Sequence, residues 1–458
     1  MILWDYIKEQ MLRYKDQKVC EEDTEISFNE LISRSEHFAD KLRGFRCCAI
    51  LCKSEMLSAA ALLSCFAAGV TAVPLSLRYG TAHCSKILDT ISPDAMITDT
   101  DGELSVGKYE GNKYSEPEEH PALIMCTSGT TGKPKGAMLS ERNIITNVGD
   151  IASYFEIGSG DKILISRPLY HCAVLTGEFL VSLVKGVAIQ FYSEKFNPIR
   201  MLELIDQYSI TAFCGTPTLL SAMARFKRDS RTKTLRHICI SGECMGADTA
   251  LMIRNSFPQC KIYHVYGLTE ACPRVSYLPP EQFAKHPDCV GIPLKSVSLK
   301  ILDTSGKECG KNEEGILWVK GENVMLGYYA EKEKTQKVLK DGWLCTGDIA
   351  CIGDSGFLKI KGRNDDLIIK AGMNIYPAEV EYELKRDSRV KEVLVYGFDT
   401  ISGKQIGMKI VGDFLSVDEV RKLCIEHLPL FQIPQVIELV DELPKNGSGK
   451  IIRGRIKS

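Results

Sequence analysis

The 458-residue sequence predicts an α/β fold: a large N-terminal domain of α/β subdomains with a small antiparallel β part, then a small, mobile α+β C-terminal domain. Three observations predict it. Strand-like apolar runs alternate with helical patterns as far as about Gly291, which is typical of a sheet with many parallel strands. Short alternating segments separated by Gly, Asp and Ser turns follow, and they indicate antiparallel hairpins. The polar run Arg363–Asp366 then introduces a short α+β stretch.

The first elements have local signals. Ser27 and Glu30 have the spacing of a capping box, which predicts a helix beginning after Ser27. Its apolar residues recur with helical spacing: Phe28, Leu31, Ile32, Phe38, Ala39 and Leu42. A strand at 48–52, a helix at 57–68 and a strand at 71–75 follow. The apolar stretch 59–75 is too short to span a membrane and is interrupted at Gly69, so it indicates a buried helix that leads into a buried strand.

The later elements follow the same reasoning. Further buried strands are predicted at 122–126, 162–165, 187–192, 212–214, 237–241 and 261–266, with helices between them, including 142–154. Antiparallel strands are predicted at 298–302, 315–319 and 356–360, and the last part contains a strand at 393–397 and a helix opened by Ser416 and Glu419. We therefore predict an N-terminal domain of residues 1–362, a hinge at 363–366 and a C-terminal domain of residues 367–458.

The composition excludes several classes of function. The formal net charge is -2 and no Lys/Arg-rich block occurs, so nothing in the charge favours nucleic acid or an anionic membrane. The eighteen cysteines are scattered without C-x-x-C spacing, which argues against a structural zinc site and predicts small core residues. The first eighteen residues lack the apolar segment of a signal peptide, and no transmembrane segment is expected. Reduced thiols indicate a cytoplasmic protein.

A glycine-rich loop after the strand at 122–126 carries the strongest signal. Its sequence is Thr127-Ser128-Gly129-Thr130-Thr131-Gly132-Lys133-Pro134-Lys135-Gly136. The glycines let backbone N–H groups turn toward an anion, and the hydroxyls and two lysines suit a triphosphate. A P-loop is excluded because two residues, not four, separate Gly129 from Gly132, and because Pro134 follows Lys133. A flexible linker would rarely follow a buried strand or carry Lys-Pro-Lys.

This loop resembles the signature of the adenylate-forming (AMP-binding) superfamily, whose members include acyl- and aryl-CoA synthetases, peptide-synthetase adenylation domains and firefly luciferase. The other motifs of the family occur in its order across nearly the whole chain. The resemblance implies that the loop binds the phosphates of ATP through Thr127, Ser128, Gly129, Thr130, Thr131, Gly132, Lys133 and Lys135.

The motif Tyr266-Gly267-Leu268-Thr269-Glu270 resembles the family's nucleotide motif. The resemblance implies that Tyr266 packs on adenine beside Gly267, that Thr269 contacts the α-phosphate and that Glu270 holds Mg²⁺. These residue types suit the roles, because an aromatic face stacks on a base and a carboxylate is a hard ligand for Mg²⁺.

Three further segments complete the implied nucleotide site. The resemblance implies that Gly242 and Glu243 lie along the adenine, although Glu243-Cys244 departs from the small residues that the family often has there. Asp348 and Arg363 match the family's ribose-binding residues. Lys450, in a final Gly/Ser-rich motif, is the implied catalytic lysine that bridges the substrate carboxylate and the α-phosphate. A preorganised ammonium there would offset the charge that develops in the transition state.

The resemblance also implies a swivel between two half-reactions. Asp365 matches the hinge position of the family, and this position coincides with the boundary placed from composition. The thiol acceptor would reach the acyl group through a channel near Ala371, Gly372 and Met373.

The motif Pro168-Leu169-Tyr170-His171 resembles the form found at the acid pocket of acyl- and aryl-CoA synthetases, where His171 would gate the pocket and act beside Thr269 and Lys450. Amino-acid-activating members have an Asp where this chain has Cys172, so a common α-amino acid is disfavoured. The pocket residues implied by the resemblance are His171, Gly215, Thr216, Ser241, Gly242 and Ala271. They are small or uncharged, which favours an uncharged acyl or aryl body.

The predicted function is therefore that of an AMP-forming acid–thiol ligase. It would use Mg·ATP to convert a small-molecule carboxylic acid to its acyl-adenylate, and CoA would then accept the acyl group. Two alternatives stay open: loading of the phosphopantetheine arm of an acyl carrier protein, and a non-catalytic homologue that only binds a nucleotide or acid. The presence of Thr131, Glu270, Asp348, Arg363 and Lys450 disfavours the second alternative.

Overall fold

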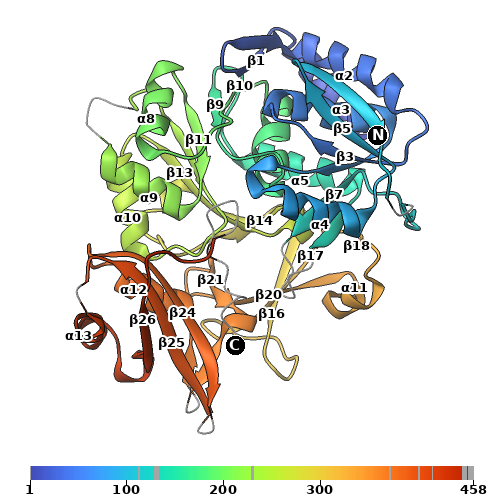
Figure 1. Cartoon of the computed structure of the whole chain (residues 1–458). Coiled ribbons are helices and arrows are strands. Elements are labelled where there is room, and N and C mark those ends of the chain that lie inside the picture. The colour runs from blue at the N-terminus through green and yellow to red at the C-terminus, as the bar shows by residue number, and fades with distance from the viewer. Residues whose placement is uncertain are drawn as a thin grey trace. The chain divides into compact units, whose positions relative to one another are not determined.

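The computed structural model describes residues 2–111, 114–127, 134–227, 232–370, 373–400, 403–414, 416–445 and residue 451. In this part the chain divides into two compact units (Figure 1). The first contains the residues up to 299 together with 318–345, and the second contains 300–317 and the residues from 346 onward. The boundary predicted from composition, at residue 363, lies within the second unit, and the hinge stays a prediction.

The larger sheet of the first unit has the strand order β15-β14-β13-β12-β11-β9-β10-β1-β2. Its strands are β1 (Lys18–Glu21), β2 (Thr24–Ser27), β9 (Lys162–Ile165), β10 (Ala188–Phe191), β11 (Ala212–Gly215), β12 (His237–Ile240), β13 (Lys261–Gly267), β14 (Arg274–Leu278) and β15 (Ile292–Pro293). The pairs from β1 through β10, β9, β11 and β12 to β13 are parallel. The pairs at both edges, β1–β2, β13–β14 and β14–β15, are antiparallel.

The second sheet of this unit has the order β18-β8-β7-β4-β3-β5-β6. Its strands are β3 (Cys47–Leu51), β4 (Thr71–Pro74), β5 (Ala95–Thr100), β6 (Glu103–Lys108), β7 (Leu123–Thr127), β8 (Lys135–Leu139) and β18 (Gly327–Tyr328). Strands β5, β3, β4 and β7 are parallel. Apolar runs such as that of β3 are continuous because both faces of a parallel sheet are covered.

Several helices of the first unit begin at a Ser, Thr or Asn side-chain cap, whereas others begin without one. They are α1 (Leu3–Arg13), α2 (Phe28–Leu42), α3 (Glu55–Ala68), α4 (Thr81–Ile91), α5 (Glu141–Tyr154), α6 (Cys172–Val174), the π-helical η2 (Leu175–Leu180), α7 (Val181–Lys185), α8 (Pro198–Gln207), α9 (Pro217–Phe226), α10 (Ala247–Ser256) and α11 (Lys332–Val338), with short 3-10 turns η1 (Leu77–Tyr79), η3 (Thr269–Ala271) and η4 (Pro280–Gln282). Ser27 accepts from the N–H of Glu30 at 3.1 Å, as predicted. Helices α8, α9 and α10 lie side by side along the larger sheet (Figure 1).

A five-stranded sheet follows in the chain, with the order β16-β17-β20-β19 and with β21 paired to β20. Its strands are β16 (Val297–Leu302), β17 (Gly315–Gly321), β19 (Leu339–Lys340), β20 (Trp343–Ile352) and β21 (Leu358–Arg363). Strand β20 pairs antiparallel with β19 and β21. The short alternating segments separated by turns that follow Gly291 therefore reflect a change to antiparallel pairing.

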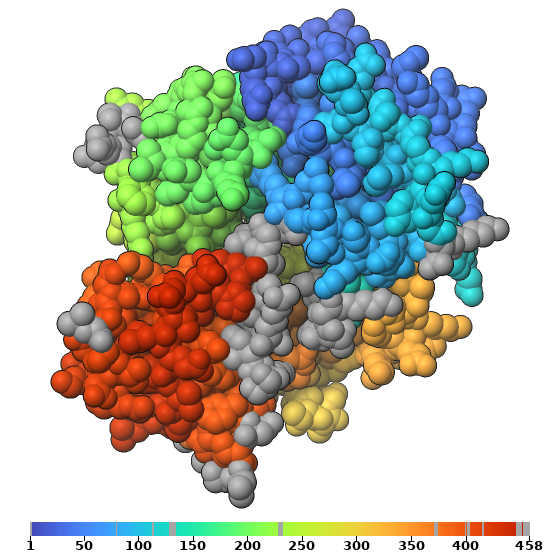
Figure 2. All heavy atoms as spheres, viewed as in Figure 1, coloured from blue at the N-terminus to red at the C-terminus, as the bar shows by residue number. Residues whose placement is uncertain are grey.

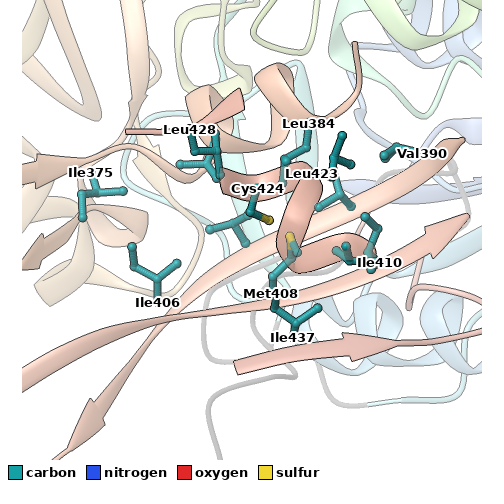
Figure 3. Packing of buried hydrophobic residues seen from close by; sticks show 14 of the residues in the cluster. Ile375, Leu384, Val390, Ile406, Met408, Ile410, Leu423, Cys424, Leu428 and Ile437 are labelled. Carbon is teal, nitrogen blue, oxygen red and sulfur yellow. The ribbon is translucent and has the colours of Figure 1, made fainter. Parts of the chain in front are cut away.

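The last part of the second unit is an α+β structure. It contains η5 (Asn364–Asp366), β22 (Ile368–Lys370), β23 (Met373–Ile375), α12 (Pro377–Leu384), β24 (Val390–Thr400), β25 (Gly403–Gly412), α13 (Val417–His427), η6 (Leu430–Gln432) and β26 (Val436–Leu439). Ser416 caps α13 by accepting from the N–H of Glu419 at 3.3 Å, as predicted. Figure 3 shows the core, in which Leu423 and Cys424 of α13 face Met408 of β25.

These elements confirm the predicted α/β fold class. Figure 2 shows all heavy atoms in the same view, and every residue of the central strands β4, β11 and β12 is buried. Fifteen of the eighteen cysteines are buried and none forms a disulfide, which confirms that most are small core residues. None of the helices in the described residues is both long and apolar enough to cross a membrane.

Candidate active site

The residues predicted to bind the acid and the nucleotide follow neighbouring parallel strands of the nine-stranded sheet. Gly215 ends β11, Ser241 follows β12, Gly267 ends β13, and His171 comes six residues after β9. The carboxyl ends of adjacent parallel strands meet at one edge, which is where α/β sheets bind ligands. The fold therefore gathers these predicted residues, which are up to about a hundred positions apart in the sequence.

The glycines at this edge have structural reasons. A Cβ on Gly267 would stand 1.7 Å from the carbonyl oxygen of Pro273, so no larger residue fits. Gly242 has φ of +94°, a conformation that favours glycine. Beside it, Thr216 caps α9 by accepting from the N–H of Leu219 at 3.3 Å. Because glycine has no side chain, Gly242 and Gly267 leave space beside the backbone at the strand ends, where the ligand is predicted to bind.

Glu243 is engaged with the protein itself. Its carboxylate accepts from the backbone N–H of Thr218 at 3.1 Å and from the Thr218 hydroxyl at 2.6 Å. These bonds fix the first turn of α9. Contact of Glu243 with adenine stays a prediction.

The predicted metal ligand and a predicted phosphate lysine meet at one aromatic ring. The Tyr328 hydroxyl donates to Oε1 of Glu270 at 2.7 Å, and Nζ of Lys135 lies 5.2 Å from the centre of the Tyr328 ring. A carboxylate and an ammonium thus both contact Tyr328. This arrangement suits Mg²⁺, which proteins usually bind through one or two carboxylates together with phosphate oxygens. Among the described residues, no group of three or more His, Cys, Asp or Glu could hold a metal alone.

The glycine-rich loop is anchored at both ends. Thr127 and Lys135 are paired across the antiparallel strands β7 and β8, so the loop joins neighbouring strands of one sheet. Residues Ser128, Gly129, Thr130, Thr131, Gly132 and Lys133 lie outside the described residues. Their contact with phosphate stays a prediction, which the positions of Thr127 and Lys135 support.

His171 is a neutral side chain at the start of α6. Burial, together with the charges of Arg167 and Arg78, lowers the pKa of His171 to about 3. The imidazole is therefore uncharged at physiological pH, which suits a wall or gate of the acid pocket and not a general acid. The neighbouring Tyr170 hydroxyl donates to the carbonyl oxygen of Cys126 at 3.2 Å and lies 3.0 Å from Nε2 of His83.

Two residues that the sequence analysis missed hold the segment before His171. Oε2 of Glu55 accepts from the N–H of Leu169 at 3.1 Å. Nη1 of Arg78 donates to the carbonyl oxygen of Ser166 at 3.2 Å. Neither residue belongs to a recognised motif, so only the three-dimensional contacts identify them.

The second unit brings together the predicted ribose-binding residues. Asp348 of β20 and Arg363 of β21 are cross-strand partners, and Nη1 of Arg363 lies 3.1 Å from Oδ1 of Asp348. The same nitrogen donates to the carbonyl oxygen of Thr346 at 2.8 Å. The Thr346 hydroxyl accepts from the N–H of Asp348 at 3.1 Å. The carboxylate is thus held in place within β20.

The remaining predicted residues have partial descriptions. Asp365 lies in the exposed 3-10 turn η5. Strands β22 and β23 pair at Lys370 and Met373, whereas Ala371, Gly372 and Lys450 lie outside the described residues. Thr269 and Ala271 lie in η3 beside Glu270. The roles assigned to all of these residues stay predictions.

Comparisons with known proteins identify the family. The family described as AMP-binding enzyme matches residues 7–329, most of the chain. The chain belongs to this family. Its relatives include a long-chain-fatty-acid–CoA ligase of Haemophilus influenzae, which is 34% identical over 76% of this chain and 64% of its own length. The chain thus spans just under two thirds of that relative.

Two further likenesses extend over nearly the whole chain. The 2-succinylbenzoate–CoA ligase of Bacillus pumilus is 31% identical over 98% of this chain and 94% of its own length. The structure of the Bacillus subtilis O-succinylbenzoate coenzyme A synthetase (MenE) in complex with ATP and magnesium ion has a TM-score of 0.86 at 27% identity, covering 99% of both chains. The predicted resemblance to acyl- and aryl-CoA synthetases of the adenylate-forming superfamily is confirmed.

Proposed function

We propose that this protein is an ATP-dependent, AMP-forming ligase that joins a carboxylic acid to CoA through an acyl-adenylate. Membership of the AMP-binding family and the CoA ligases among the relatives support this activity. The ATP and magnesium complex of a whole-length structural relative supports the two cofactors. The observation that carries the proposal is the arrangement of Lys135 and Glu270 around Tyr328, because binding of Mg·ATP needs both a cation and a carboxylate and both contact this one residue.

In the first half-reaction a carboxylate oxygen attacks the α-phosphorus of ATP and pyrophosphate leaves. Lys135 and the glycine-rich loop would bind the phosphates, and Glu270 would hold Mg²⁺, which would supply neutralising charge. Tyr266 packs on the adenine, and Asp348 and Arg363 bind the ribose. Catalysis rests on positioning and on charge neutralisation, with Lys450 as the ammonium between the two anions.

In the second half-reaction the thiol of CoA attacks the acyl carbon. The bond between this carbon and the bridging oxygen breaks, and AMP leaves with that oxygen. This step uses the hinge at Asp365, about which the C-terminal domain turns. The thiol reaches the acyl group through the channel near Ala371–Met373. The neutral side chain of His171 forms one wall of the acid pocket. Because it is uncharged, it does not form an ion pair with a substrate carboxylate. The free state of the eighteen cysteines supports the prediction of a cytoplasmic protein, since thiols stay reduced there.

Pyrophosphate release tests this proposal. The purified protein is incubated with Mg·ATP and a panel of carboxylic acids, with and without CoA. Acid-dependent release that rises with CoA, and that falls on the order of 10²–10³-fold in Lys450→Ala, is the expected result. Release that CoA leaves unchanged would favour a carrier protein's phosphopantetheine as acceptor. A protein that neither releases pyrophosphate nor binds ATP would contradict the proposal.

A further inference from the structure

Tyr170 is a half-buried residue whose side chain contacts two predicted parts of the active site. It directly precedes His171, the predicted wall of the acid pocket, and the two rings pack edge to face with their centres 5.5 Å apart. The Tyr170 hydroxyl donates to the carbonyl oxygen of Cys126 at 3.2 Å. Cys126 directly precedes Thr127, the first residue of the glycine-rich loop. The hydrogen bond therefore ends one peptide bond away from that loop.

This hydrogen bond joins two different sheets of the first unit. Tyr170 follows β9 of the nine-stranded sheet, whereas Cys126 belongs to β7 of the seven-stranded sheet. Nε2 of His83, in α4, lies 3.0 Å from the same hydroxyl. Because the O–H of Tyr170 is already directed at the Cys126 carbonyl, the imidazole N–H is the donor in this second contact. The hydroxyl is thus held by one partner that accepts and one that donates.

The residues before Tyr170 are fixed by other contacts. The carboxylate of Glu55 holds the N–H of Leu169, and the guanidinium of Arg78 holds the carbonyl oxygen of Ser166. Beside them is a cavity with about 250 Å³ of empty space, whose lining includes Leu169, Tyr170 and Glu55. Because no atoms pack against Tyr170 across this space, its position depends on the hydrogen bonds of its hydroxyl.

The adenylation step makes a strict demand on the positions of its two substrates. The attacking carboxylate oxygen has to come within about 3–3.5 Å of the α-phosphorus, and a misplacement of about 1 Å can cost on the order of 100-fold in rate. The acid is predicted to bind beside His171, and the triphosphate at the loop that begins with Thr127. These two residues belong to segments that follow different sheets, so their separation depends on contacts between the segments. The hydrogen bond from Tyr170 to Cys126 is such a contact.

We propose that Tyr170 is a positioning residue for adenylation: its ring supports His171, while its hydroxyl holds the strand that leads into the glycine-rich loop. The inference rests on the proposed function, whose first half-reaction it concerns. Thioester formation makes no equal demand, because the acyl carbon and the phosphate are already joined in the acyl-adenylate. Loss of the Tyr170 hydroxyl should therefore slow the first half-reaction selectively.

Tyr170→Phe tests this role, because phenylalanine keeps the ring beside His171 and removes only the hydroxyl. Adenylation is followed as pyrophosphate release with Mg·ATP and whichever of hexanoate, octanoate, benzoate and phenylpropanoate the wild type uses fastest. Thioester formation is followed separately, from the synthetic adenylate of the same acid and CoA. We expect kcat for adenylation to fall by about 10–100-fold, with KM for acid and ATP within about threefold and thioester formation within about twofold of the wild type. An equal fall in both half-reactions, or no fall in either, would overturn the positioning role.

Two further variants complete the test. Tyr192→Phe is the matched control, since it removes a hydroxyl that donates to the exposed Glu194 at 3.1 Å, and both half-reactions should stay unchanged. His83→Ala removes the donor to the Tyr170 hydroxyl and should cause a smaller fall that is confined to adenylation. Should Tyr170→Phe fail to fold, His83→Ala decides, and an unselective effect or none would then overturn the role. A wild type that neither releases pyrophosphate nor binds ATP would instead contradict the proposed function.

Discussion

Glu55 is a buried carboxyl group whose titration should make the stability of the first unit depend on pH. It begins α3 and is 8% exposed. Burial raises the pKa of Glu55 to about 7; the N–H of Leu169 and the charge of Arg78 oppose this effect, and Glu21 adds to it. Oε1 of Glu55 lies 3.9 Å from Nη2 of Arg78, which is too far for a compensating hydrogen bond.

The sign of the effect follows from the raised pKa. A carboxyl group that binds its proton more tightly when folded stabilises the folded state fully below its ordinary value of 4.5. This contribution is lost as the pH rises through the folded value of about 7. At about 1.4 kcal/mol for each pKa unit, the loss is on the order of 3 kcal/mol by about pH 8.

Glu55→Gln tests this reasoning, because glutamine keeps the acceptor for Leu169 but does not titrate. We expect the Tm of the variant, relative to the wild type, to rise by on the order of 5 °C between about pH 5 and about pH 8. Scanning calorimetry at several pH values measures this difference. Glu119→Gln, at an exposed glutamate, is the control and should show no such trend. A Tm difference for Glu55→Gln that stays constant over the range would refute the argument.

Three other substitutions test the roles proposed for site residues. Asp348→Asn should weaken ATP binding by about 10–100-fold, since it removes a charged acceptor, and an unchanged Kd by calorimetry would exclude the ribose role. Glu270→Gln should raise the Mg²⁺ concentration for half-maximal pyrophosphate release by about tenfold or more, whereas an unaltered Mg²⁺ dependence would remove Glu270 as a ligand. Asp365→Pro should slow thioester formation more than adenylation, because proline fixes φ at the hinge; equal loss of both rates would count against a swivel there.

The elements predicted well have signals contained within a few residues. Ser27 and Ser416 cap the helices that their spacing indicates. The continuous apolar runs of β3 and β4 are parallel strands, as burial on both faces requires. The glycine-rich loop begins at the last residue of β7, and the Tyr266–Glu270 motif begins at the end of β13, as expected. Such signals depend on local backbone chemistry, which is why one sequence suffices to read them.

The residues that were missed act through contacts between distant positions. Tyr328 reaches Glu270 across 58 positions, and Glu55 reaches Leu169 across 114. Arg274 of β14 reaches Cys239 of β12 across 35 positions. Tertiary packing, which no local spacing encodes, decides these roles.

The domain boundary illustrates a related limit. The polar run at residues 363–366 is a strong turn signal, and it predicts a boundary after β21. The second compact unit nevertheless includes β21 and part of β20, because Asp348 and Arg363 pair across these strands. A turn signal locates a change of direction in the chain, whereas compactness depends on which strands pair.

The fate of a carboxylate oxygen tests the central claim most directly. An acid labelled with a heavy oxygen isotope is incubated with the enzyme, Mg·ATP and CoA, and the AMP is analysed by mass spectrometry. If the acid attacks the α-phosphorus, the AMP carries one labelled oxygen and the acyl-CoA retains the other. Label in inorganic phosphate with ADP as the nucleotide product, or unlabelled AMP alongside acyl-CoA, would contradict an acyl-adenylate and with it the proposed function.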